Sequence, residues 1–255
     1  MLLRRVIDHV KKQEWTAVAL DFVIVVVGVF IGLQVNNWNE ARGQRSAEAG
    51  YLAALESDAV FSINSLQETL SRMDQAQEAR RALYEVNREG KAELPPAEVN
   101  KLVQGAMFNI QRMNIRQVAF DALTNSGQLS LIRDPELASE LQALDAAIKL
   151  ARRWEGESVN FTYEFSDPYL ISEADTENLM ISGIVGDGLS VAWIKGNEAP
   201  TLTAEQLKSA RFKNLLLYQA EISRGRAHAT ADCLEQYQKV LDLIRARQSE
   251  IGRRP

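Results

Sequence analysis

The sequence predicts an all-α protein, in which one N-terminal transmembrane helix is followed by a long-helix antiparallel bundle with a short irregular or β-hairpin insert. Residues 22–35 hold one polar side chain, that of Gln34, and so favour a helix in lipid. Beyond residue 50, apolar residues recur at spacings of three and four, which is typical of helices with one buried stripe. Glycine and proline concentrate in one later stretch, 167–202, which we expect to be the loop-rich insert.

The transmembrane helix is predicted to cover residues 15–38. Trp15 and Trp38 lie 23 positions apart, which is roughly 35 Å of helix at ~1.5 Å per residue. This length suits a hydrocarbon core of about 30 Å, and tryptophan is enriched at both interfaces of a bilayer. A cleaved signal peptide is the alternative, but residues 36–40 lack a small-x-small cleavage site. We therefore predict an uncleaved signal anchor, with the lipid bilayer as its partner.

Basic residues predict the orientation of this anchor. Four precede the span and two follow it closely: Arg4, Arg5, Lys11, Lys12, Arg42 and Arg45. Because basic flanks stay in the cytoplasm, we expect a cytoplasmic N-terminus and an extracytoplasmic domain, 39–255, at the inner membrane of a cell. Residues 1–14 form a basic amphipathic segment that could lie at the inner interface, or could extend the same helix.

One face of the span carries small and polar residues. Gly28 and Gly32 form a G-x-x-x-G pair, which lets two helix backbones approach closely in lipid. Asp21 lies nearer the inner edge, where an ionised carboxylate costs less than the ~2.5–3.5 kcal/mol expected at the bilayer centre. These residues predict a homo-oligomer, or capture of an unidentified membrane protein partner, through the membrane helix. The alternative is that the glycines are coincidental and that Asp21 simply reaches the interface.

The anchor also resembles the N-terminal signature of a bacterial family of single-pass membrane proteins of unknown function. The similar residues are the acidic Asp21, the run VVGVFIGLQ at 26–34 and NNWNE at 36–40. Looser similarity continues at 120–132 and 211–214. The acidic position is commonly Glu in the family, so Asp21 departs from the pattern. The resemblance implies a membrane protein and supplies no catalytic residues.

Composition and local signals complete the prediction of the fold. The net charge of −5 argues against a nucleic-acid partner. Cys233 is the one cysteine, which we expect to be a small buried residue. Helix boundaries are indicated by capping residues, by glycine and by proline. These are Gly90 and Gly127 as helix ends, Pro96 and Pro135 as first-turn residues, Asp134 as an N-cap, Thr203 to Gln206 as a capping box, and Gly225 as a kink in the last helix.

No catalytic, cofactor or metal site follows from the sequence. His9 and His228, the two histidines, are predicted on opposite sides of the membrane, so they support neither a zinc site nor a catalytic triad. The acidic run 173–177 lacks the glycine and final glutamate of an EF-hand, and the glycines at 183–188 lack the order of a phosphate-binding loop. We expect that the protein has no cofactor and no enzymatic activity.

Aromatic residues gather around the insert, and they are the remaining candidate site: Trp154, Phe161, Tyr163, Phe165 and Trp193. One interpretation is a small satellite core beneath a long loop. The other is a pocket or partner surface lined by aromatic rings.

The function most favoured is that of a non-enzymatic interaction or scaffolding protein in the cell envelope. The alternative is an extracytoplasmic ligand-binding or sensory module. Such a module would act through a partner membrane protein, because the sequence has no second span and no cytoplasmic output domain.

Overall fold

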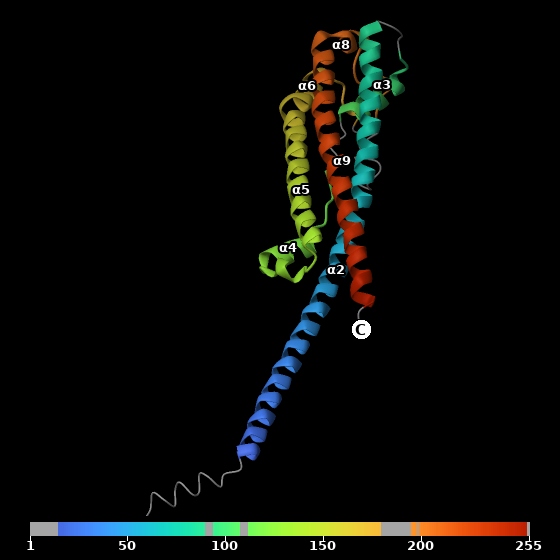
Figure 1. Cartoon of the computed structure of the whole chain (residues 1–255). Helices are drawn as coiled ribbons and strands as arrows, with labels where there is room; N and C mark the ends of the chain where they lie inside the picture. The colour runs from blue at the N-terminus through green and yellow to red at the C-terminus, as the bar shows by residue number, and fades with distance from the viewer. Residues whose placement is uncertain (1–14, 90–93, 108–111, 180–194, 198, 254–255) are drawn as a thin grey trace, which may run out of the picture. The chain divides into compact units, whose positions relative to one another are not determined.

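A computed structural model describes residues 15–89, 94–107, 112–179, 195–197 and 199–253 (Figure 1). This described part contains helices and no strands, so the all-α prediction is confirmed there. The chain divides into two units, residues 1–50 and 51–255. The elements in chain order are α2 (Trp15–Glu89), α3 (Pro96–Met107), α4 (Val118–Asn125), the 3₁₀ turn η1 (Gln128–Leu131), α5 (Pro135–Phe161), the π-helical turn η2 (Thr162–Ser166), α6 (Asp167–Glu173), α8 (Ala204–Lys208) and α9 (Ala210–Arg253).

The first unit contains the apolar part of α2. The large apolar side chains between Leu20 and Trp38 are 48% to 69% exposed. A core helix of a soluble protein would bury such side chains. Within the described residues, this is one helix that is long and apolar enough to cross a membrane.

The predicted packing face of this helix is open in the single chain. A Cβ atom added at Gly28 or Gly32 would meet no atom within 4 Å. The side chain of Asp21 is exposed, and the Arg42 guanidinium lies 5.7 Å from the centre of the Trp38 ring. Trp15 is the first residue of α2.

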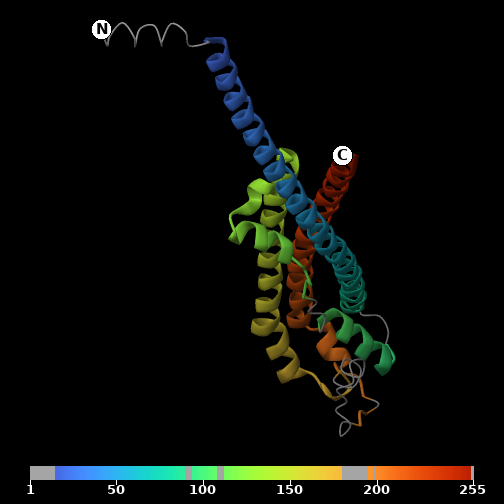
Figure 2. The ribbon, with the colours of Figure 1, turned by 90° about the horizontal axis from the view of Figure 1, so that it is seen from below.

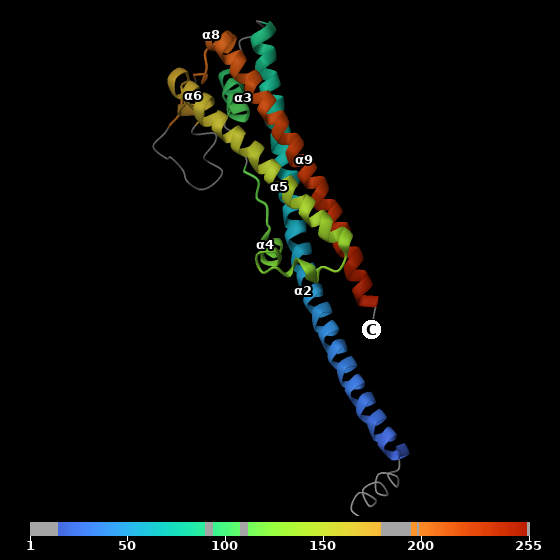
Figure 3. The ribbon, with the colours of Figure 1, turned by 60° about the vertical axis from the view of Figure 1, so that its left-hand side comes forward.

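The second unit has a hydrophobic core between α5, α9 and the part of α2 that follows residue 50. Helices α5 and α9 lie side by side and run in opposite directions (Figures 1 and 3). Their buried faces come from the predicted three-and-four spacing, and a buried leucine contributes roughly 1.5–3 kcal/mol. The buried members of this core include Leu52, Leu55, Leu66, Leu123, Leu137, Leu141, Leu144, Ile148, Tyr237, Val240 and Ile244.

A second core cluster lies where α3, α6, α8 and the start of α9 meet the last turns of α2. Figures 1 and 2 place α3 beside both the C-terminal end of α2 and α8. The Asn87 amide of α2 donates a hydrogen bond to the carbonyl of Leu207 in α8 at 2.6 Å and so joins the two helices. The buried members include Leu83, Val103, Met107, Tyr169, Leu170, Leu202, Phe212 and Leu216.

Several of the local signals for helix ends are confirmed in this unit, whereas Gly90 lies outside the described residues. The Asp134 carboxylate accepts from the N–H groups of Glu136 and Leu137, at 2.9 and 3.1 Å, which satisfies two otherwise unpaired donors of α5. Thr203 and Gln206 form the predicted capping box of α8. Gly127 ends α4 in the left-handed region, with φ of 69°.

One boundary of the predicted insert is wrong. Helical structure continues from α5 through η2 into α6, and so it covers 167–173, the first part of the stretch expected to be loop-rich. Pro168 lies in the first turn of α6, directly after the π-helical turn, and the helical run continues through it. The predicted hairpin, with its turn at 186–188, lies outside the described residues.

Candidate functional site

A hollow of about 590 Å³ lies between the α5–η2–α6 segment and the first turns of α9. We call it the aromatic hollow. Its lining is mainly apolar, with polar groups at the rim. The lining residues are Phe161, Glu164, Phe165, Pro168, Tyr169, Arg211, Asn214, Leu215 and Tyr218.

The π-helical turn shapes one wall of this hollow. The Phe161 ring, in the last turn of α5, and the Phe165 ring, in η2, have centroids 5.1 Å apart and are tilted by 32°. Phe165 is 54% exposed, and Tyr218 on α9 is 65% exposed. Single π-helical turns are rare and are frequent at functional sites. The hollow therefore presents two large aromatic side chains to solvent.

Ring stacking and an ion pair hold the buried side of the aromatic hollow. Tyr169 is buried and its ring is stacked on Phe212, with centroids 5.9 Å apart. The Arg211 guanidinium lies 5.2 Å from the centre of the Tyr169 ring and pairs with Glu173 at 2.6 Å. Burial raises the pKa of the Tyr169 hydroxyl, so this ring stays neutral. The Arg211 guanidinium is thus already paired with the Glu173 carboxylate.

The predicted aromatic set is only partly brought together. Phe161 and Phe165 line the hollow, whereas Tyr163, which is 57% exposed, does not. Trp154 packs against the first core cluster and covers Gly225 of α9, where an added Cβ would lie 2.6 Å from two ring atoms. Trp193 lies outside the described residues. The sequence did not indicate Tyr218, because it comes from a helix distant along the chain.

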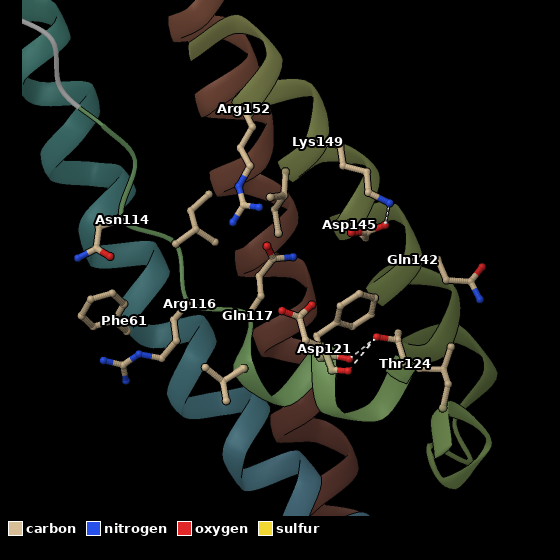
Figure 4. A pocket seen from close by; sticks show the side chains of 15 residues that line it. Phe61, Asn114, Arg116, Gln117, Asp121, Thr124, Gln142, Asp145, Lys149 and Arg152 are labelled. Carbon is tan, nitrogen blue, oxygen red and sulfur yellow. Dashed lines mark hydrogen bonds and ion pairs between the residues drawn. The ribbon is translucent and has the colours of Figure 1, made fainter. Parts of the chain in front are cut away.

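A second hollow, of about 1040 Å³, has both polar and apolar side chains in its walls (Figure 4). We call it the polar hollow. It lies between α4, α5, the strap of residues 112–117 and one residue of α2. Its lining residues are Phe61, Asn114, Ile115, Arg116, Gln117, Val118, Phe120, Asp121, Thr124, Leu129, Gln142, Asp145, Ile148, Lys149 and Arg152.

Buried polar side chains of α2 hold the strap in place. The Ser62 hydroxyl accepts from the Arg116 N–H at 3.0 Å and donates to the Arg116 carbonyl at 3.3 Å. The Asp58 carboxylate accepts from the Ala119 N–H at 2.8 Å and so caps the first turn of α4 from another helix. Ser62 is fully buried and Asp58 nearly so. Removing either partner would leave a buried group unsatisfied, which costs about 1–3 kcal/mol.

The charged groups of the polar hollow are not all paired with one another. Lys149 and Asp145 form an ion pair at 2.5 Å, and the Arg116 guanidinium lies 3.9 Å from the centre of the Phe61 ring. Arg152 points into the hollow from α5, and the Asp121 carboxylate faces it from α4 (Figure 4). Neither of these two side chains has a hydrogen bond or an ion pair within the described part of the chain.

Two arginines are buried between α2 and α9, outside both hollows. Arg80 donates to the Ala106 carbonyl at 3.0 Å, and burial lowers its pKa to about 10. Arg226 is 3% exposed, and burial lowers its pKa as well. The nearest carboxylate is Glu155, at 3.8 Å from Nη2 of Arg226. Within the described residues, Nε and Nη2 of Arg226 have no hydrogen-bond partner.

Among the described residues, no group of three or more His, Cys, Asp or Glu side chains is placed to hold a metal ion. Cys233 is buried, and burial raises the pKa of its thiol to about 12. The described part of the chain therefore offers the aromatic hollow and the polar hollow as candidate sites. The chain was compared with protein-family models, with curated proteins and with solved structures, and none of the three comparisons found a match. The resemblance of the anchor to a family of membrane proteins stays a prediction.

Proposed function

We propose that this chain is a single-pass membrane protein that acts by holding another protein, without catalysis, through the aromatic hollow of its helical domain. The observation that carries the proposal is the exposure of Phe165 and Tyr218, each more than half exposed, on either side of an apolar hollow. Exposed aromatic side chains at the edge of a pocket are the usual anchors of a protein interface.

The partner that fits best is an amphipathic helix of a protein in the same membrane. A hollow with apolar walls and a polar rim accepts the apolar face of a helix, while Glu164 and Asn214 at the rim meet its polar flank. Tethering both proteins to one bilayer raises their effective concentration, so a small hollow can suffice for binding.

The proposal includes a cytoplasmic N-terminus and an extracytoplasmic helical bundle. Its support is the excess of basic residues before the span over those just after it. A phosphatase that is active only outside the cytoplasm, fused after Arg253, should be active. The opposite orientation would be indicated if the phosphatase fusion were well expressed but inactive, and if a reporter that fluoresces only in the cytoplasm were fluorescent when fused at the same position.

Site-specific photo-crosslinking tests the interaction. A photoreactive phenylalanine analogue replaces Phe165 or Tyr218 in the full chain, expressed in its membrane. Tyr163, two positions from Phe165 and similarly exposed, and Leu150 on α5, which is 46% exposed, are matched controls outside the hollow. We expect a crosslinked protein of one defined mass at the first two positions. Equal crosslinking at all four positions, or none at any, would contradict the proposal.

Ligand binding is the second candidate function, and the polar hollow favours it. Its volume of about 1040 Å³ lies just above the range of about 300–1,000 Å³ that is usual for small-molecule sites. Its walls combine apolar side chains with five charged ones, Arg116, Asp121, Asp145, Lys149 and Arg152. The identity of a suitable ligand follows from those charges.

A further inference from the structure

We infer that the polar hollow is a binding site for a free amino acid with an apolar side chain. The inference rests on the second candidate function proposed above, ligand binding at this hollow, and names its ligand; it is independent of the protein interaction at the aromatic hollow. It rests on one guanidinium, one carboxylate and one apolar wall, all of which face the same space.

The two charges define the ionic part of the ligand. Arg152 and Asp121 approach the hollow from different helices, α5 and α4 (Figure 4), and no ion pair joins them in the described structure. A guanidinium binds a carboxylate in a bidentate manner. A carboxylate accepts hydrogen bonds from an ammonium group. Arg152 and Asp121 are both exposed, so a molecule that carries both groups can reach them and pair with the two together.

A ligand with a single charge fits less well. An anion bound at Arg152 would also face the Asp121 carboxylate, and a cation bound at Asp121 would face the Arg152 guanidinium. Like charges in one site oppose binding. The nearby Lys149 and Asp145 already neutralise one another, and the Arg116 guanidinium lies over the Phe61 ring, away from Arg152 (Figure 4). The hollow therefore selects for a ligand with balanced charge.

The remaining lining indicates the rest of the ligand. Ile115, Phe120, Leu129 and Ile148 contribute apolar surface to the same hollow, so the ligand's side chain should be apolar. The Gln117 amide lies between Arg152 and Asp121 in Figure 4, where it can donate to a carboxylate and accept from an ammonium group.

The walls are fixed before any ligand arrives. The strap that carries Gln117 is anchored through the Ser62–Arg116 bonds, and α4, which carries Asp121, is capped by Asp58. Sites whose groups are held by buried hydrogen bonds lose little entropy on binding.

Calorimetric titration of the full chain in lipid nanodiscs with each standard L-amino acid tests the inference. We expect at least one apolar amino acid to bind with a Kd of about 1 mM or tighter. Its analogue without the amino group, and its analogue without the carboxylate, should each bind about tenfold or more weakly. This comparison uses the unaltered protein, so it does not depend on how any variant folds.

Variants locate the site. Arg152→Gln and Asp121→Asn should each weaken binding by about tenfold or more. Arg153→Gln and Glu157→Gln change exposed side chains of α5 outside the lining and should leave the Kd unchanged. Circular dichroism checks that all four variants melt as the parent does.

Three results would overturn the inference. The first is that no standard amino acid binds at concentrations up to about 10 mM. The second is that an analogue with one charge binds as tightly as the amino acid. The third is that the control variants lose as much affinity as Arg152→Gln and Asp121→Asn.

Discussion

Gly225 and Trp154 give the sharpest test of the packing between α5 and α9. In Gly225→Ala, the new Cβ would lie 2.6 Å from two atoms of the Trp154 indole and 3.0 Å from a third. Gly156, on α5, is the matched control, because a Cβ there would meet no atom within 4 Å. The same substitution thus meets a rigid ring at one position and open space at the other.

The expected free energies follow from two opposing effects. Replacing glycine by alanine inside a helix stabilises it by about 1 kcal/mol. Overpacking of a well-filled contact costs typically 1–3 kcal/mol. Gly156→Ala should therefore raise the free energy of unfolding by up to ~1 kcal/mol. Gly225→Ala should lower it by roughly 0–2 kcal/mol, the difference of the two effects.

Urea denaturation followed by circular dichroism measures both variants in the full chain. The same two substitutions, made in the Trp154→Ala background, complete a double-mutant cycle. Once the indole is gone, Gly225→Ala should become stabilising, as Gly156→Ala is. The reasoning is refuted if Gly225→Ala stabilises the parent protein as much as Gly156→Ala does, because the ring then cannot occupy the space beside Gly225.

Three further predictions concern buried and paired groups in the helical domain. Arg226→Met should be neutral or stabilising, because it removes a poorly paired buried charge. Glu155→Gln should destabilise, because it removes the carboxylate 3.8 Å from that charge, but by less than the ~3–5 kcal/mol expected for breaking a well-formed buried ion pair. The reverse order in urea denaturation would show that the guanidinium is well solvated. Hydrogen bonds from Arg245 and Gln248 hold the pKa of Glu56 below its ordinary value of 4.5. The stabilisation that they give is therefore complete above pH 4.5 and is lost as the pH falls through the lower pKa of the folded state. Arg245→Met should reduce the drop in the urea midpoint between neutral and acidic pH, and an unchanged drop would contradict this. The Cys233 thiol, whose pKa burial raises to about 12, should react with a maleimide at slightly alkaline pH only after unfolding; rapid labelling of the folded chain would refute its burial.

The features that the sequence predicted well are decided by neighbours along the chain. Asp134 and Thr203 cap their helices through N–H groups two or three residues away. Gly127 ends α4 because its left-handed backbone conformation favours glycine. The apolar span is visible because lipid demands a continuous run of apolar residues.

The features that the sequence could not predict depend on distant contacts. Asp58 caps α4 although the two lie far apart in sequence, and Arg152 faces Asp121 only because α4 and α5 are both packed on the same core. Gly225 looked like a kink, but its lack of a side chain accommodates an indole from another helix. The turn η2 carries no local signal, since any residue can adopt its backbone angles.

The central claim is that the aromatic hollow holds a second protein at the membrane. Native mass spectrometry of the tagged full chain, extracted gently from its own membrane, tests it most directly. We predict a stoichiometric second protein with the parent and with Tyr163→Ala. The double variant Phe165→Ala/Tyr218→Ala should lose it, because truncating interface anchors of this kind costs about 2 kcal/mol or more each. A parent chain that is monomeric, or a double variant that retains the same complex, would contradict the claim.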